Sequence, residues 1–193
     1  ATTGIWKIEK RLDNVIDYTT NIEKTINSDY GKDSYYDLHN VIDYVEADYK
    51  TEKQFYVSGV NCNPKTALEE MTITKEQYGK TGGILGFHAF QSFAEGEVTP
   101  EQCHAIGVRL AEEMWGDRFE VVVSTHLNTN HYHNHFVINS VSFKDGKRYY
   151  DKRETYAELR RLSDSLCEEY GLSVIKEKPC RNSRINFANY QKD

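Results

Sequence analysis

The chain has 193 residues, of which 38% are hydrophobic and 28% are charged, and its formal net charge is −6. This composition excludes a disordered chain, and the lack of any eighteen-residue apolar run excludes a membrane-spanning helix. The negative balance disfavours non-specific nucleic-acid binding, because phosphate contacts need Lys and Arg, and four scattered cysteines without a C-x-x-C pair fit a reducing compartment.

The first half of the chain mixes strand and helix patterns. A short strand is expected at residues 5–8, and "RLDNVIDYTTNIEKT" (11–25) predicts a short helix with apolar residues on one face. A loop and a helix are expected between Asp33 and Lys50. "QFYVSGVNC" (54–62) begins as a strand and is broken by Gly and Asn. A further helix should begin at Pro64 and end near Gly79 or at the Gly82–Gly83 pair.

The second half predicts three more strands and two longer helices. "ILGFHAFQSF" (84–93) reads as a strand, and "TPEQ" (99–102) combines a capping box with Pro at the first helical position, for a helix that ends at Gly116. "RFEVVVSTH" (118–126) and "HNHFVINSVSF" (133–143) are strand-like.

A tight turn at Lys144–Lys147 leads into "RYY", and a helix follows from Glu154 to Tyr170. These elements predict an α/β fold (α+β, two-layer), with a central antiparallel sheet of about five strands flanked by helices.

Four of the seven histidines lie within "HLNTNHYHNHFVIN", residues 126–139. Two strand-like runs joined by a short polar segment predict a β-hairpin here. Alternate residues of a strand face the same side, so His133 and His135 share a face, and His126 ends the neighbouring strand across the turn. The spacing therefore predicts that these three imidazoles converge, while His131 lies in the turn and Asn134 points the other way.

Three neutral imidazoles at one point form a divalent metal site that keeps coordination positions open, which indicates catalysis or substrate binding. Zinc accepts imidazole ligands and magnesium prefers oxygen, so a borderline ion such as manganese is a natural candidate. The spacing leaves ester hydrolysis, hydration and phosphoryl transfer open. The alternative is a set of turn histidines on the surface.

This stretch resembles the third motif of relaxases, the HUH-type DNA nickases of plasmids and integrative conjugative elements. It is most similar to the pattern of the MOBP branch, H-x-D-T-x-x-x-H-x-H-x-x-x-N. The residues that match its metal histidines are His126, His133 and His135. Thr129 and Asn139 match as well, whereas Asn128 stands where the family usually has Asp.

Other segments are similar to the same family. "YVSGVNC" (56–62) resembles the second motif, and "FHAFQSFAEGEVTPEQ" (87–102) resembles the family's H-x-x-x-S-F-x-x-x-E-x-T-P-E segment. "VIDYTTNIEKT" (15–25) resembles the first motif, in which Tyr18 holds the nucleophile's position and Ile22 replaces a common Pro.

The resemblance implies metal-dependent, site- and strand-specific nicking and rejoining of DNA at an origin of transfer, which initiates conjugative mobilisation. Tyr18 would attack the scissile phosphate and leave a covalent 5′-phosphotyrosyl link; Tyr30, Tyr35 and Tyr36 are competitors for this role. The expected metal is Mn²⁺ or Mg²⁺, with Zn²⁺ as the alternative.

Two further groups of residues are assigned roles around this site. Those expected to bind DNA, as phosphate or turn contacts near the site, are Lys24, Thr25, Ser58, Lys144, Lys147 and Arg148. Those expected to support the metal ligands from behind, or to contact DNA from the turn, are His88, His131, Asn128 and Asn139.

The family resemblance also implies partners and a location. These are single-stranded and hairpin DNA at the origin of transfer, a relaxosome accessory protein and a type IV secretion coupling protein. The chain is expected to be a monomer without membrane contact, cytoplasmic in a bacterium and transferred with the DNA into the recipient cell. Residues 1–193 are expected to form one relaxase domain, the N-terminal part of a longer protein.

Two other functions compete with this one. A rolling-circle replication initiator shares the His-x-His site but carries its tyrosine in a helix after the histidines, where Tyr156 and Tyr170 lie. A metal-stabilised DNA-binding module would bind without cleaving. Metal-dependent cleavage with a covalent tyrosyl product separates the nucleases from the binding module.

Overall fold

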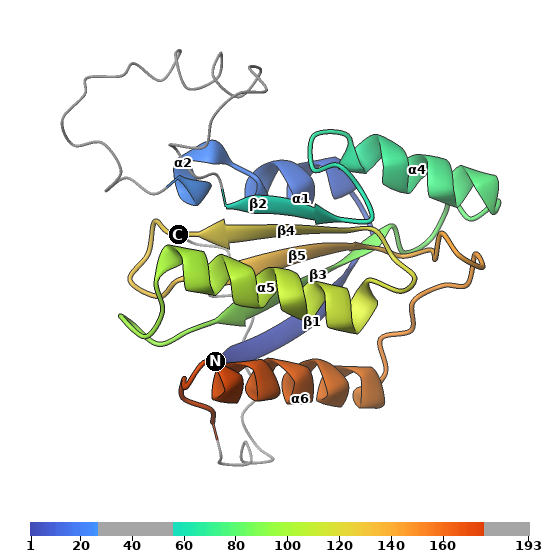
Figure 1. Ribbon diagram of the computed structural model, residues 1–193. Coiled ribbons are helices and arrows are strands. Elements are labelled where there is room, and N and C mark those ends of the chain that lie inside the picture. Colours follow the sequence, from blue (N-terminus) through green and yellow to red (C-terminus); the bar gives the residue numbers. More distant parts are fainter. Residues whose placement is uncertain (27–55, 176–193) are drawn as a thin grey trace, which may run out of the picture.

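A five-stranded antiparallel sheet forms the centre of the computed structural model, which describes residues 1–26 and 56–175 (Figure 1). The strand order is β1-β3-β5-β4-β2, and every neighbouring pair is antiparallel. This confirms the expected fold class and number of strands. The strands are β1 (Thr2–Ile8), β2 (Val57–Val60), β3 (Gly86–Ser92), β4 (Val121–His126) and β5 (His133–Asn139).

Helices cover both faces of this sheet. On one face α5 packs against β2, β4 and β5, and α6 packs against β1 and α5. On the other face α1 packs against β4, β5 and α4, and the short α2 contacts β4. The helices are α1 (Leu12–Thr19), α2 (Ile22–Thr25), α4 (Ala67–Gln77), α5 (Pro100–Trp115) and α6 (Arg153–Glu169).

The strands β4 and β5 bury apolar side chains on both faces, which explains their continuous apolar sequence. Val121 and Val123 enter a large core with α5 and α6, whereas Val122 enters a smaller core with Val137 of β5 and with α1 and α4. The smaller core covers only part of its face. At the end of β4, that face carries histidines in place of apolar residues.

The local signals for the long helices are confirmed. Thr99 and Gln102 form both hydrogen bonds of the capping box at the start of α5, worth about 1 kcal/mol in such helices, and Gly116 follows its last residue. The helix α6 begins and ends one residue before the predicted bounds.

Several boundaries differ from prediction. The strand expected at residues 5–8 begins at Thr2, and the helix expected over residues 11–25 is divided into α1 and α2. The helix α4 begins at Ala67 because residues 64–66 form a turn. After the turn at Gly146, residues 148–150 form only an isolated bridge between Val141 and Arg148, without a regular strand.

Some expectations lie outside the described residues: the loop and helix between Asp33 and Lys50, and the candidate nucleophiles Tyr30, Tyr35 and Tyr36. Among the helices that the structure does describe, none is both long and apolar enough to span a membrane.

Candidate active site

The three predicted histidines meet where β4 ends and β5 begins. His126 and His133 are register partners in the β4–β5 pair, and His135 lies two residues further along β5 on the same face. One nitrogen from each ring lies within 4.8 Å of those of the other two. The convergence inferred from the spacing is therefore what the structure shows, and we call His126, His133 and His135 the triad.

Each triad ring uses one nitrogen for a hydrogen bond within the protein. His126 Nε2 donates to the main-chain oxygen of Thr19 at 2.9 Å, and His133 Nδ1 donates to that of His131 at 2.9 Å. His135 Nδ1 lies 2.9 Å from Nε2 of His88. Metal-binding histidines are oriented in this way, by a partner on the nitrogen that does not bind the ion.

The remaining nitrogens are free to bind a cation. A carbonyl oxygen can only accept, so the protons sit on His126 Nε2 and His133 Nδ1, and the other nitrogen of each ring keeps its lone pair. His135 Nε2 is buried and has no hydrogen-bond partner within the described part of the chain. A buried polar atom without a partner is costly unless it binds something, so the donor set fits a divalent ion.

Burial also keeps the triad in the neutral form that binds metals. Desolvation lowers the pKa of His126 to about 4 and holds the pKa of His135 well below its ordinary value. The positive charge of Lys24 depresses the pKa of all three triad histidines further, because it disfavours a second cation nearby.

Tyr18 lies over this site. Its ring is 5.7 Å from the His126 ring and 6.1 Å from the His135 ring, in edge-on contacts, and 47% of the residue is exposed. Lys24 places its Nζ 3.5 Å from the centroid of the Tyr18 ring. A phenol, an ammonium group and three imidazoles therefore share one open-sided site.

Main-chain hydrogen bonds place the segment that carries Tyr18 and Lys24. Thr19, next to Tyr18, bonds His126 as described. The carbonyl of Lys24 accepts from the N–H of Leu127 at 2.8 Å, and that of Thr25 accepts from Tyr56 at 3.2 Å. The N-terminal helices are thus attached to the end of β4, where the triad lies.

Comparison with known proteins identifies the family. Residues 22–172 match the family model described as "Relaxase: MobA/VirD2-like, nuclease domain". The chain belongs to the relaxase family. The matched range contains the whole triad and begins four residues after Tyr18, so the match does not itself include the candidate nucleophile.

Named relatives point the same way. This relaxase is 42% identical over 119 residues to "Protein rlx" of Staphylococcus aureus, an alignment that covers 62% of the chain and 38% of the relative. It is 29% identical to "Group II intron-interrupted relaxase LtrB" of Lactococcus lactis subsp. cremoris, over 94% of the chain and 38% of the relative. The aligned part of the chain thus spans about two fifths of the length of these relatives.

A solved structure supports the fold of this relaxase. It is described as "Molecular Basis of Vancomycin Resistance Transfer in Staphylococcus aureus" and superposes with a TM-score of 0.52 over 90% of this chain and 96% of that chain. The sequence identity is 14%, so the likeness concerns the fold alone.

Of the four residues expected to support the ligands, two form hydrogen bonds with triad residues in the described part of the chain and two do not. His88 bonds His135 directly, and burial lowers the pKa of His88 to about 3. His131 acts through its main-chain oxygen, which also accepts from Thr129, while its ring faces the oxygen of Phe93. Asn128 is exposed in the turn.

Asn139 does not lie near the triad, so this expectation is wrong. It shares a face with His133 and His135 but lies at the opposite end of β5, about 20 Å from His133 at the usual rise per strand residue. Its amide donates to Glu120 at 3.0 Å and to the main-chain oxygen of Met71 at 3.2 Å. It therefore joins α4 to the residue just before β4 at that end.

Three of the basic residues expected near the site are also at that far end. They follow β5, whose first residue is in the triad. Lys144 pairs with Asp117 at 2.6 Å, and Lys147 pairs with Asp145 at 3.3 Å. Arg148 donates to the main-chain oxygens of Ile84 and Gly82. The expectation that these cations lie beside the triad is wrong.

The other expected DNA contacts are divided. Lys24 lies at the site, as described. Thr25 is fully buried, and its hydroxyl donates to the carbonyl of Asn21, so it offers DNA no surface. Ser58 Oγ lies 2.7 Å from His104 Nε2 on the opposite face of the sheet. In the segment that resembles the second motif, a side chain at Gly59 would collide with the carbonyl of Cys62. Packing alone therefore explains a glycine at this position.

Sequence reasoning gave His104 no role, yet it is bonded on both ring nitrogens, to Ser58 and, at 2.8 Å, to Thr125. Burial lowers its pKa to about 4.

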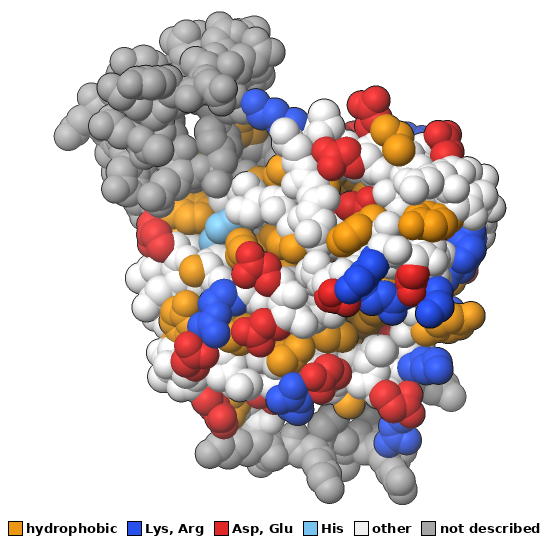
Figure 2. Space-filling view, turned by 45° about the vertical axis from the view of Figure 1, so that its right-hand side comes forward, with side chains coloured by type: hydrophobic (Ala, Val, Ile, Leu, Met, Phe, Trp, Pro, Cys, Tyr) orange, Lys and Arg blue, Asp and Glu red, His pale blue; other side chains and the backbone are white. Residues whose placement is uncertain are grey.

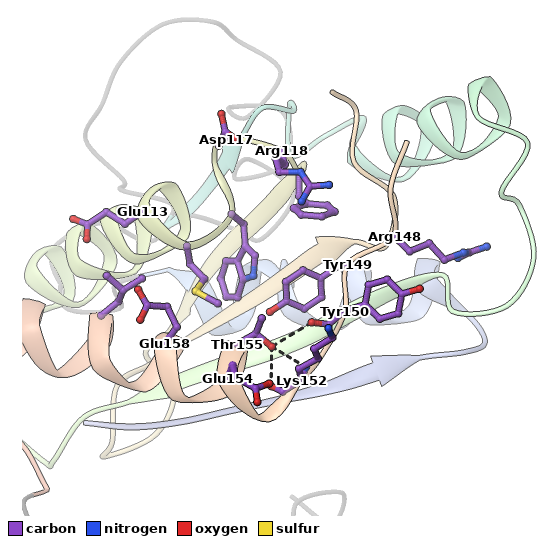
Figure 3. Close-up of a pocket in the computed structure, with 14 residues that line it drawn as sticks. Glu113, Asp117, Arg118, Arg148, Tyr149, Tyr150, Lys152, Glu154, Thr155 and Glu158 are labelled. Atoms are coloured by element: carbon purple, nitrogen blue, oxygen red, sulfur yellow. Dashed lines mark hydrogen bonds between the residues drawn. The ribbon is translucent and has the colours of Figure 1, made fainter. Parts of the chain in front are cut away.

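A separate pocket lies at the far end of the sheet (Figure 3). It is lined by the ends of α5 and α6 and by the residues after β5, among them Trp115 and Tyr149. Within it Thr155 bonds Lys152 and the carbonyl of Tyr150. No triad residue lines this pocket, so it is not part of the candidate active site.

Proposed function

We propose that this relaxase nicks one DNA strand at an origin of transfer and rejoins it, with Tyr18 as nucleophile and the triad as metal ligands. The position of Tyr18 over a buried histidine triad, with Lys24 against its ring, is the observation that carries the proposal. Because the chain aligns with only part of its relatives' length, we also propose, and do not take from the family match, that the whole protein has this activity.

The chemistry follows from the groups at hand. Tyr18 Oη attacks phosphorus and forms an O–P bond, while the bond from phosphorus to the 3′-oxygen breaks. The phenol proton passes to solvent at the exposed side of Tyr18, and the leaving 3′-oxygen takes up a proton. A divalent ion held by the triad would polarise the phosphate and neutralise its charge. The phosphotyrosyl ester keeps the bond energy, so the reverse step reseals the strand.

Among the described residues, Lys24 offers this site a cation for the phosphate. Its ammonium group lies beside both the phenol and the triad, where charge builds up on the phosphate oxygens in the transition state. Away from the site, acidic and basic side chains are interspersed on the face that Figure 2 shows. Local contacts, and not a uniformly basic surface, are therefore proposed to hold the DNA.

Exposed aromatic rings near the triad provide a surface for bases. Besides Tyr18, Trp6 of β1 is 39% exposed, and its ring lies edge-on against His88 at 4.3 Å. Unpaired bases stack on such rings whatever their identity. We propose that single-stranded DNA crosses the triad with a base against Trp6.

The geometry disfavours the rolling-circle arrangement. Tyr156 and Tyr170 lie on and just after α6, which packs on the sheet face opposite the triad. Tyr156 donates its hydroxyl to the carbonyl of Thr3. Neither tyrosine reaches the triad without displacing α6.

The experiment is a nicking assay on labelled single-stranded oligonucleotides that tile the transfer-origin region of the element encoding the chain, with and without Mn²⁺. Wild type should give a denaturant-stable protein–DNA adduct, Tyr18→Phe should give none, and the matched control Tyr156→Phe should behave as wild type. An undiminished adduct with Tyr18→Phe rules out this nucleophile, and a wild-type chain that binds DNA without an adduct favours the binding module.

The remaining parts of the proposal rest on the family. The metal is proposed to be Mn²⁺ or Mg²⁺, with Zn²⁺ as the alternative that imidazole ligands also accept. Hairpin DNA, a relaxosome accessory protein and a type IV coupling protein are proposed as partners. The chain is proposed to act as a monomer in the bacterial cytoplasm and to enter the recipient with the DNA.

A further inference from the structure

A continuous chain of polar side chains crosses the core on the sheet face opposite the triad. It runs from the edge strand β2 through α5, β4, β5 and β3 to α6, and its hydrogen bonds measure between 2.6 and 3.1 Å. We call it the polar chain. Its members, in order, are Ser58, His104, Thr125, Asn134, Gln91 and Ser163.

The centre of the polar chain is fully buried and fully bonded. The Asn134 oxygen accepts from Thr125 at 2.6 Å, and its nitrogen donates to Gln91 at 3.1 Å and to the carbonyl of Cys103 at 2.8 Å. A Cβ at Gly107 of α5 would lie 2.5 Å from that nitrogen, so the helix has no side chain where the amide lies. The packing of α5 is thus shaped around Asn134.

Such an arrangement would be unnecessary for stability alone. A buried polar network is costly if any bond is missing, and apolar side chains of similar size often stabilise a core equally well. What a satisfied network adds is a single defined arrangement of the elements that it joins.

The members at the centre are immediate neighbours of the metal ligands. Thr125 precedes His126, and Asn134 stands between His133 and His135. Thr125 and Asn134 are also register partners, as are His126 and His133. Successive residues of a strand point to opposite faces, so the bond from Thr125 to Asn134 lies directly behind the triad and ties together the two backbones from which all three rings project.

We propose that Thr125 and Asn134 are positioning residues that set the spacing of the triad, with His104 as their anchor to α5. They would touch neither metal nor DNA, and they would act by fixing the register and separation of the ends of β4 and β5. This inference rests on the proposed metal-binding function of the triad.

Thr125→Val is the direct test, because it keeps the shape of the side chain and removes the hydroxyl that bonds both His104 and Asn134. The expected result is Mn²⁺ affinity weakened by about tenfold or more, the usual effect of losing a group that orients a metal ligand. The absorption spectrum of the Co²⁺-loaded protein should also change, since it reports ligand geometry. Thr125→Ser, which restores the hydroxyl, should recover both.

Thr74→Val is the matched control. Thr74 is a buried threonine of α4 whose hydroxyl donates to Glu120, which also binds Asn139 at the far end of the sheet. Its loss should lower the urea midpoint of the metal-free chain as Thr125→Val does, while Mn²⁺ affinity and the Co²⁺ spectrum stay those of wild type. If Thr125→Val fails to fold, His104→Leu removes the anchor at a half-buried helix position and should weaken Mn²⁺ binding in the same direction.

Wild-type Mn²⁺ affinity in both Thr125→Val and His104→Leu overturns the inference, and so does an equal loss of affinity in Thr74→Val. Each of these results leaves the proposed function standing, because wild type still binds the ion. A wild-type chain that binds no divalent ion overturns both proposals.

Discussion

Replacement of Lys24 by Met should change metal binding and DNA cleavage in opposite directions. The substitution keeps most of the length of the side chain and removes its charge. In the metal-free protein, this charge already disfavours protonation of the three triad histidines. The same repulsion must act on a divalent ion in their place, whereas it becomes attraction once a phosphate is bound.

The size of the effect follows from the geometry. Lys24 Nζ lies 3.5 Å from the Tyr18 ring centroid, and that ring lies 5.7 Å from the His126 ring. At a separation of about 8 Å, Coulomb's law gives about 1 kcal/mol between a unit charge and a divalent ion at the dielectric constant of water, and about 4 kcal/mol at an effective value of 20. Lys24 is only half-buried, so we expect the lower figure, which is about fivefold tighter Mn²⁺ binding.

Calorimetric titration with Mn²⁺ and the oligonucleotide nicking assay measure the two effects on the same preparations. Lys24→Met should bind Mn²⁺ more tightly and nick at least about tenfold more slowly, since one charge-assisted phosphate contact is lost. Lys144→Met, which removes an exposed lysine paired with Asp117 at the far end, should leave both unchanged. Weaker Mn²⁺ binding in Lys24→Met would refute the electrostatic reasoning.

Three further outcomes are expected. His88→Leu removes the partner of His135 and should weaken Mn²⁺ binding by about 10- to 100-fold in calorimetry. The control His131→Ala keeps the main-chain oxygen that orients His133 and should bind Mn²⁺ normally. Equal losses of affinity in the two variants would contradict this prediction. The free energy of unfolding of the metal-free chain in urea should fall as the pH decreases from 6.5 to about 4. The reason is that buried His104 and His126 stay neutral in the folded chain, whereas the same residues are protonated in the unfolded chain. Each such imidazole contributes up to about 1.4 kcal/mol per pH unit, and a flat profile would show that burial does not hold them neutral. Trp6→Ala should weaken binding of a single-stranded oligonucleotide by about 5- to 100-fold in fluorescence anisotropy, with Trp6→Phe close to wild type, and unchanged affinity in Trp6→Ala would remove Trp6 from the DNA path.

The convergence of the triad could be predicted from the sequence because it depends only on residues that are close together in the chain. Residues two apart on a strand share a face, and a short turn brings the end of one strand beside the start of the next. His126, His133 and His135 need no more than this to converge. The helix start at Thr99 was equally predictable, since both bonds of its capping box join residues three apart.

The far-end residues show why a shared face is not a shared location. Asn139 has the same parity along β5 as His133 and His135, yet the length of the strand separates it from the triad. The basic residues at 144–148 follow the same strand, so they had to lie at its other end. The direction of β5 predicts this position, whereas the clustering of basic residues in the sequence suggests a DNA contact near the site.

His104 had no signal of this kind. It stands alone on a helix, and its partners Ser58 and Thr125 lie 46 and 21 residues away. Ser58 meets the rest of the polar chain only because β2 pairs with β4 at the sheet edge, and the sequence does not encode that pairing in any local pattern.

The hydrogen bond from His126 to the carbonyl of Thr19 would couple ion binding at the triad to the docking of Tyr18. An ion bound by the triad would order His126 and with it the backbone beside Tyr18, and by thermodynamic reciprocity the docking of Tyr18 would return the same free energy to ion binding. If Tyr18 carries the DNA strand and the triad holds the ion, as proposed, tension on that strand would be transmitted to His126. Departure of the attached strand from the site would then favour release of the ion, and the reverse.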